Sequence, residues 1–181
     1  LHIVNISLLF YNEYVLKAPI PENEIKRSEA VHRLALLDKN SNEIFDKLTR
    51  EATIRLGVPI STLTIIDKDI EWYKSHIGIE KEGGARETSF CGHALLANDI
   101  FVVIDTLKDE RFADNPMVVG PPFIRFYAGI ALIDHVTGNP VGVFCIKDIK
   151  PRQFNTNQMG ILIDIASRAE KELNKSNPEI L

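Results

Sequence analysis

Cys91 and His93 are the residues of this chain whose types and spacing come closest to a catalytic pair. The block from 89 to 97 is predicted to be a short helix, and a thiol near a helix N-terminus can have a lowered pKa, which favours the nucleophilic thiolate. Residues two apart on a helix point to different faces, so His93 would not easily reach Cys91 as a base. Two interpretations stay open: a reactive thiol, and a small buried thiol that packs between helix and sheet.

The remaining candidate ligands do not form a metal or phosphate site in the sequence. Two cysteines, Cys91 and Cys145, cannot make a disulfide framework or a four-cysteine zinc site, and free thiols fit a reducing cytoplasm, which is the predicted location. The pair Gly83-Gly84 lacks the Lys-Ser/Thr that follows a phosphate-binding loop. No metal or cofactor is therefore predicted. The histidines are scattered without ligand spacing: His2, His32, His76, His93 and His135.

Composition indicates one ordinary globular domain. The 181 residues are 45% hydrophobic and 25% charged, with a formal net charge of −4. This acidic balance argues against nucleic acid as a main partner. No apolar run reaches the ~18 to 20 residues that span a bilayer, and residues 1–16 lack the features of a signal peptide, so no membrane partner is predicted.

The elements that would position these residues alternate between helical and strand patterns. Two helices are predicted first, over 22–37 and from an N-cap at Ser41 to Leu56, with Gly57 placed to end the second. A last helix starts at Asn155 or Thr156 and ends at Leu173, with an apolar stripe. Hairpin-like pairs of strands indicate an α+β fold with a mainly antiparallel sheet. The predicted strands are 61–66, 71–77, 100–104, 124–132 and 141–147, with a loop over 80–86.

Four blocks in one order resemble the GAF domains found in bacterial sensor histidine kinases and diguanylate cyclases. The resemblance runs from about Ser28 to about Leu173. It implies a GAF fold with a sheet of five to six strands, terminal helices on one face and a pocket covered by helices and loops on the other. The blocks are Trp72-Tyr73-Lys74-Ser75, Ser89-Phe90-Cys91-Gly92-His93-Ala94, Arg111-Phe112-Ala113-Asp114-Asn115-Pro116 and Arg125-Phe126-Tyr127-Ala128-Gly129.

The resemblance also implies organisation and partners. We expect an N-terminal flanking segment over 1–21, the GAF domain over 22–175 and a C-terminal tail over 176–181. Related GAF domains pair through their terminal helices, so a homodimer on the helices Glu22–Leu37 and Thr156–Leu173 is predicted, with Leu173 at the interface. The family implies that such a dimer passes a signal to an output domain.

A ligand pocket is expected where aromatic and polar residues gather in these blocks. Strand alternation puts Arg125 and Tyr127 on one side and Phe126 on the other, so a guanidinium beside an aromatic wall would hold a small anionic molecule. In the alternative, Arg125 pairs with Asp105 or Asp114 over a filled core. The predicted ligand-binding residues are Trp72, Ser75, Phe90, Cys91, His93, Asp105, Arg111, Arg125 and Tyr127.

Three functions remain open at this point. The first is a non-catalytic sensory module that binds an unknown small molecule and signals through a dimer. The second is a thiol-dependent reductase similar to the free methionine sulfoxide reductases, although Cys145 lies in a core strand and Cys91 therefore lacks an evident resolving thiol. The third is a dimerisation module without a ligand. Similarity to bilin-binding and cyclic-nucleotide GAF domains does not extend to their signature residues.

Overall fold

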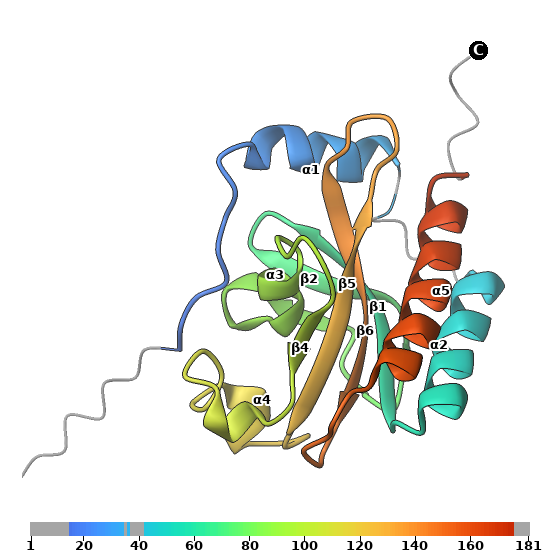
Figure 1. Cartoon of the computed structure of the whole chain (residues 1–181). Helices are drawn as coiled ribbons and strands as arrows, with labels where there is room; N and C mark the ends of the chain where they lie inside the picture. Colours follow the sequence, from blue (N-terminus) through green and yellow to red (C-terminus); the bar gives the residue numbers. More distant parts are fainter. Residues whose placement is uncertain (1–14, 35, 37–41, 176–181) are drawn as a thin grey trace, which may run out of the picture.

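The computed structural model describes residues 15–34, 36 and 42–175, and its centre is a single sheet of six strands (Figure 1). The strand order is β3-β2-β1-β6-β5-β4, and the paired neighbours run antiparallel. The α+β class and the mainly antiparallel sheet predicted from the sequence are confirmed. The strands are β1 (Ile60–Asp67), β2 (Ile70–Ile77), β3 (Gly83–Ala85), β4 (Phe101–Val103), β5 (Phe126–Ile133) and β6 (Pro140–Asp148).

The edge strand β3 lies inside the segment that the sequence predicted to be a loop. It pairs with β2 from Ile70 to Trp72. A Cβ on Gly83 would lie 2.2 Å from the carbonyl oxygen of Glu71, so only glycine lets the two backbones approach this closely. Gly83, one of the two glycines that indicated a loop, is therefore what allows this strand to pair.

Two antiparallel-packed helices cover one face of the sheet, which we call the helix face. They are α2 (Glu43–Leu56) and α5 (Thr156–Leu173), on the right of the sheet in Figure 1. The side chain of Asn42 caps α2, while the predicted cap Ser41 lies outside the described residues. Gly57 ends α2 in the left-handed conformation at φ 62°, as predicted. Asn155 caps α5 through a capping box with Gln158.

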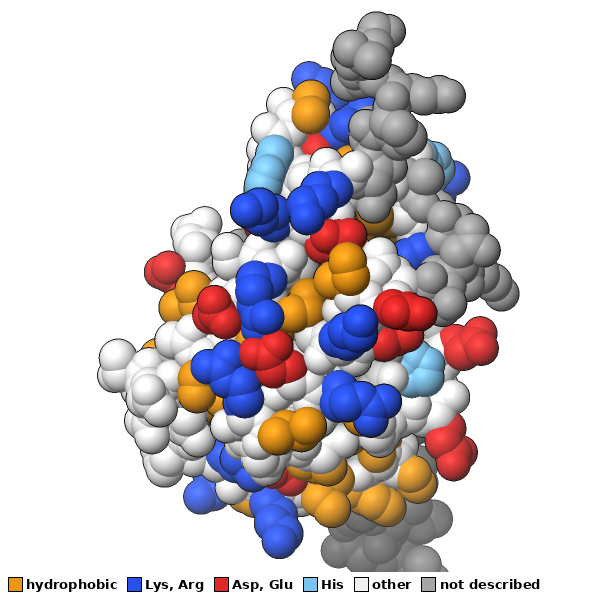
Figure 2. Space-filling view, turned by 90° about the vertical axis from the view of Figure 1, so that its right-hand side faces the viewer, with side chains coloured by type: hydrophobic (Ala, Val, Ile, Leu, Met, Phe, Trp, Pro, Cys, Tyr) orange, Lys and Arg blue, Asp and Glu red, His pale blue; other side chains and the backbone are white. Residues whose placement is uncertain are grey.

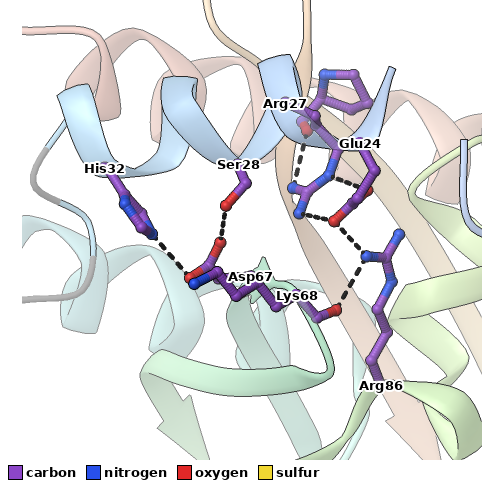
Figure 3. A network of polar contacts seen from close by, with 8 residues as sticks. Glu24, Arg27, Ser28, His32, Asp67, Lys68 and Arg86 are labelled. Carbon is purple, nitrogen blue, oxygen red and sulfur yellow. Dashed lines mark hydrogen bonds and ion pairs between the residues drawn. The ribbon is translucent and has the colours of Figure 1, made fainter. Parts of the chain in front are cut away.

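A third helix, α1 (Glu24–Arg33), lies across one end of the sheet (Figure 1). It is shorter than the predicted 22–37, of which residues 35 and 37 lie outside the described part. Polar contacts to the sheet hold it in place (Figure 3). Ser28 and His32 both bind the carboxylate of Asp67 at the end of β1, at 2.5 and 2.9 Å.

The opposite face of the sheet, which we call the covered face, lies under short segments. These segments are η1 (Arg86–Thr88), α3 (Phe90–Ala94), η2 (Thr106–Lys108) and α4 (Pro116–Val119). Figure 1 shows α3 and α4 on the side of the sheet away from α2 and α5. The amide of Asn115, the residue that caps α4, donates to the carbonyl of Thr88 at 2.7 Å and so ties the two covering segments together.

Each sheet face has its own hydrophobic core. On the helix face, Leu63, Ile65, Phe126 and Phe144 pack against α2 and α5. On the covered face the core is centred on Tyr127 with residues of α3 and α4. Phe126 and Tyr127 thus lie on opposite faces, as strand alternation predicted.

The predicted terminal segments are only partly described. The flanking segment 1–21 is described from residue 15, and the tail 176–181 lies outside the described residues. Within the described part of the chain, no helix combines the length and the apolar character needed to cross a bilayer.

Candidate functional site

The covered face carries a group of polar side chains buried between α3 and the sheet. None of them is more than 5% exposed. They come from β1, β2, β5, β6 and the start of α3, so distant parts of the chain meet here. We call this group the buried polar cluster, and its members are Thr62, Thr64, Glu71, Tyr73, Ser89, Cys91, Tyr127, Cys145 and Lys147.

The two cysteines of the chain meet inside this cluster. Cys91 Sγ lies 3.6 Å from Cys145 Sγ, and both thiols are free. The hydroxyl of Tyr127 donates to Cys91 at 3.2 Å, and Cys91 contacts the hydroxyl oxygen of Thr64 at 3.4 Å. Thr62 Oγ1 lies 3.0 Å from Cys145 Sγ. The expectation that Cys91 has no thiol partner is therefore wrong, because the β1–β6–β5 pairing presents Cys145 directly beneath α3.

A carboxylate and an ammonium group are buried beside the thiols. Tyr73 donates its hydroxyl hydrogen to Glu71 Oε1 at 3.2 Å, and Ser89 donates to Glu71 Oε2. Ser89 also accepts from the amide of Gly92 at 2.9 Å, so one hydroxyl both caps α3 and holds Glu71. Lys147 Nζ lies 5.0 Å above the ring of Tyr73.

Burial and neighbouring charge pull the pKa values of the cluster apart. Burial raises the pKa of Glu71, against the opposing charge of Lys147. Burial would lower the pKa of Lys147, but the negative groups around it, Cys145 first, outweigh burial and raise it. Burial and the contact with Cys145 hold the pKa of Cys91 well above its usual range. For Cys145 the contact with Cys91 and the charge of Lys147 outweigh burial and lower the pKa to about 6.

A stack of aromatic rings fills the rest of the covered face. Tyr127 stacks on Phe90 at 5.2 Å between ring centroids, and Phe90 stacks on Phe112 at 4.4 Å. Phe101 meets Phe112 edge-on at 6.1 Å. The Tyr127 ring lies flat over Gly129, where a Cβ would come within 2.6 Å of the tyrosine oxygen. The Arg-Phe-Tyr-Ala-Gly block thus builds a packed ring on the sheet in place of an open pocket wall.

Trp72 and Ser75 lie on the other side of the sheet from Tyr127. Trp72 pairs with Ile65 and packs against the helix-face core. Ser75 donates to Asp46 of α2 at 2.6 Å. The predicted grouping of Trp72 with Arg125 and Tyr127 is not formed, because a β-bulge between Leu63 and Thr64 sets which β2 residues face each way.

Arg125, which was predicted to hold an anion, and Arg111, another predicted ligand-binding residue, are both engaged by carboxylates. Arg125 donates from Nη2 and Nε to Asp105 at 2.9 and 3.2 Å, which is the alternative that the sequence left open. Arg111 forms a two-point contact with Asp109 at 2.6 and 2.8 Å and lies 4.7 Å over the ring of Phe101. The Arg125–Asp105 pair and the contact of Arg111 with Phe101 hold the covering loop to the sheet, while the Arg111–Asp109 pair lies within that loop.

His93 points away from the thiols and toward the N-terminal segment. Its Nε2 lies 3.0 Å from the carbonyl oxygen of Leu16, and its ring meets Phe112 edge-on at 4.9 Å. Burial lowers the pKa of His93. As the helix spacing predicts, His93 is no base for Cys91.

Arg86 is a buried arginine at the start of η1, the first of the covering segments, and the sequence analysis did not predict a role for it. Arg86 is 2% exposed. Its Nη1 donates to Glu24 at 2.6 Å and to the carbonyl of Lys68 at 3.0 Å (Figure 3), while Nε and Nη2 find no hydrogen-bond partner among the described residues. Buried guanidinium hydrogens without an acceptor are costly, so they indicate a site that another group completes.

Arg86 lines a cavity of about 500 Å³ between the N-terminal segment and the β1–β2 turn. This volume falls within the range of small-molecule sites. Three other cavities of 350 to 470 Å³ lie elsewhere on the described residues, and neither Trp72 nor Tyr127 lines any of the four. The walls of the Arg86 cavity are Lys17, Ala18, Ile20, Asp69, Ala85, Arg86 and Glu87.

The residues that the sequence analysis missed carried weak signals. Lys147 and Asp148 end an otherwise apolar strand, and this change from apolar to charged residues is the sequence mark of buried charge in β6. Glu71 lies just before the Trp72-Tyr73-Lys74-Ser75 block, in which the aromatic residues drew the attention. Arg86 lies three residues before the Ser-Phe-Cys block, and no nearby residue in the sequence marks the carboxylate that it binds. Across the described residues, no group of three or more His, Cys, Asp or Glu side chains is placed to hold a metal ion.

The fold and the short segments over the covered face are those of a GAF domain. The GAF domain family matches residues 40–173, and the chain belongs to this family. Over 134 residues it is 38% identical to a cyclic di-GMP phosphodiesterase of Pseudomonas aeruginosa, covering 74% of this chain but only 23% of that protein. The chain thus spans about a quarter of this relative.

Solved structures share the fold at low sequence identity. The GAF domain of a phosphoenolpyruvate-protein phosphotransferase from Coxiella burnetii superposes with a TM-score of 0.63 at 13% identity, covering 85% of this chain and 94% of that one. A type II free methionine-R-sulfoxide reductase from Thermoplasma acidophilum superposes with a TM-score of 0.59 at 13% identity, covering 73% and 91%. At such identity these structures show the fold alone.

Proposed function

We propose that this chain is a non-catalytic sensory module that binds a small anionic molecule and signals through a homodimer to an output domain or partner protein. The match to the GAF family and the 38% identity to part of a cyclic di-GMP phosphodiesterase support a regulatory role. The matched part is 23% of the length of the phosphodiesterase relative. We propose that the output domain regulated by this chain resembles that of this relative.

The observation that carries the ligand proposal is the unsatisfied Arg86. A guanidinium fork binds a carboxylate or phosphate in two-point geometry, and Arg125 and Arg111 already have such carboxylates. Arg86 is 2% exposed and lines a cavity of suitable size, and its Nε and Nη2 are buried, so a ligand anion in the cavity would complete them after a local shift of the cavity wall. The anion-binding role expected of Arg125 is therefore assigned to Arg86.

Native mass spectrometry of protein purified gently from cells tests this proposal. The wild type is expected to carry a bound anionic molecule that Arg86→Gln loses. The matched control is Arg125→Gln, which removes a guanidinium already paired with Asp105 and should keep the molecule. Circular dichroism confirms that both variants are folded. Loss in Arg125→Gln with retention in folded Arg86→Gln would place the ligand elsewhere.

A thiol-dependent reductase is the second candidate, favoured by the 3.6 Å separation of Cys91 and Cys145. Against it, both thiols are at most 1% exposed and neither lines any of the four cavities. Incubation with free methionine sulfoxide and dithiothreitol separates the two candidates. The sensory proposal expects no turnover, whereas turnover that Cys91→Ser abolishes would establish the reductase.

A further inference from the structure

The two thiols of the buried polar cluster are placed for chemistry with each other. Their sulfur atoms are 3.6 Å apart, which is van der Waals contact, and a disulfide needs about 2.0 Å. Cys91 lies in the five-residue helix α3 and Cys145 lies in the central strand β6. Because α3 is short, a small shift of α3 or a rotation of one side chain closes this distance without breaking the sheet.

We propose that Cys91 and Cys145 form a reversible disulfide inside the folded domain when hydrogen peroxide reaches them. This is a modification site independent of the Arg86 cavity and of any output domain. Peroxide is nearly the size of water, so it reaches a buried thiol through smaller and more frequent local openings than bulkier reagents need.

The neighbours of Cys145 favour it as the thiol that attacks peroxide first. Lys147 follows two residues along β6 on the same face, and its positive charge stabilises a thiolate at Cys145. Thr62 Oγ1 lies 3.0 Å from Cys145 Sγ and can donate to that thiolate. The other titratable groups that face the thiol pair are Glu71, Tyr73 and Tyr127.

The reaction balances with peroxide as the oxidant. The Cys145 thiolate attacks one peroxide oxygen, an S–O bond forms, the O–O bond breaks, and the departing hydroxide takes a proton to become water. Cys91 Sγ then attacks the sulfenic sulfur, the S–S bond forms, the S–O bond breaks, and hydroxide leaves with the proton of Cys91 as a second water. Two thiols lose two electrons, and one peroxide gains them.

Intact-mass and peptide analysis of the folded chain after peroxide treatment tests the proposal. The expected product is a monomeric chain that has lost two hydrogen masses, with a peptide linking Cys91 to Cys145, and dithiothreitol restores the original mass. Circular dichroism before and after shows that the fold persists. Two free thiols in the folded protein, at peroxide concentrations that oxidise glutathione, would overturn the proposal, as would oxidation that occurs only after unfolding.

Single-cysteine variants supply the matched controls. Cys91→Ala leaves Cys145 without a partner, so a sulfenic acid that dimedone traps is expected there. Cys145→Ala leaves Cys91, whose oxidation should be slower than disulfide formation in the wild type because burial still disfavours its thiolate. Equal rates of oxidation by peroxide in Cys91→Ala and Cys145→Ala would contradict the assignment of Cys145 as the thiol that reacts first.

The pH profile separates reactivity from packing. The rate of disulfide formation should rise through a midpoint near the pKa of Cys145, about 6. In Lys147→Met the midpoint should move to higher pH, while Lys147→Arg, which keeps the positive charge, should retain a low midpoint. A profile that is identical in the wild type and in folded Lys147→Met would overturn the role of Lys147.

Discussion

At the scale of single residues, the sequence blocks that resemble the GAF family contribute mainly to the packing of the core. Tyr127 is fully buried, stacks on Phe90 and donates to Cys91. Gly129 leaves the space in which that ring lies. The glycine of the Arg-Phe-Tyr-Ala-Gly block is therefore required by a side chain of its own strand.

Replacing Gly129 with alanine should destabilise the domain. The added Cβ would lie 2.6 Å from the Tyr127 oxygen and 3.0 Å from two of its ring carbons, so the ring must move out of its stack. Overpacking of this kind costs roughly 1–3 kcal/mol, measured as the free energy of unfolding in urea.

Gly160→Ala is the matched control for this prediction. Gly160 lies in α5 with nothing within 4 Å of the added Cβ, so the same change should stabilise the protein by about 0.5–1 kcal/mol. Equal stability of Gly129→Ala and wild type would mean that the Tyr127 ring does not occupy this position in solution.

At the scale of elements, α1 is attached to the sheet both by Ala30 and Val31, which are buried in the helix-face core, and by polar contacts. Glu24 joins Arg27 of its own helix to Arg86 of η1, and Asp67 of β1 holds Ser28 and His32 (Figure 3). The GAF match begins at residue 40, after α1. Ionised carboxylates therefore contribute to the attachment of this helix.

Acidification should release α1 before the rest of the domain. Burial alone would raise the pKa of Glu24 and of Asp67, but hydrogen bonds from Arg27 and Ser28 respectively, with other partners, outweigh it and lower both values. A lowered carboxyl pKa contributes stability above the ordinary values of 4.5 and 3.8, and this contribution is lost as the pH falls through the folded-state values.

Hydrogen-exchange protection factors, corrected for the intrinsic pH dependence, measure this release. Protection of α1 amides should fall by about tenfold or more between pH 5 and pH 3, while α5 stays protected. Asp67→Asn should already weaken α1 at pH 7 and flatten its pH dependence. Simultaneous loss of protection in α1 and α5 would instead indicate global unfolding.

At the scale of the whole molecule, the outer surface of α2 and α5 is the exposed side of the helix face. Figure 2 shows basic and acidic side chains intermixed there with separate hydrophobic ones. Arg168 of α5 pairs with Glu51 of α2 at 2.6 Å. Ile163 on α5 is 50% exposed, whereas Leu173 is fully buried in the core of its own domain. Leu173 is thus unsuited to the interface role expected of it.

The proposed homodimer should depend on Ile163. Ile163→Glu is expected to give a folded monomer at tens of micromolar by sedimentation velocity, because it places a charge in the apolar part of the interface. Ile70→Glu, a change at an equally exposed isoleucine on β2, should leave the dimer intact. Leu173→Glu should unfold the domain, and a wild-type monomer at this concentration would contradict the dimer.

The sequence by itself determined the elements and their order. Periodicity placed α2, α5 and the four long strands, because burying one face of a helix or strand leaves a local pattern in the chain. The capping residues Asn155 and Gly57 marked helix ends through contacts within a few positions. The blocks around Cys91 and Tyr127 pointed to the family, which the GAF match confirms.

Only the tertiary structure decided which side chains meet. A single bulge in the β1–β2 pairing, in which Lys74 is the extra residue of β2, puts Trp72 and Ser75 on the same face, and the β1–β6–β5 pairing brings Cys145 to Cys91 across 54 positions of sequence. Nε and Nη2 of Arg125 find a carboxylate, whereas the same atoms of Arg86 do not, and this difference depends on how separate loops fold. Such contacts depend on strand register and on long-range packing, and neither leaves a local trace in the chain.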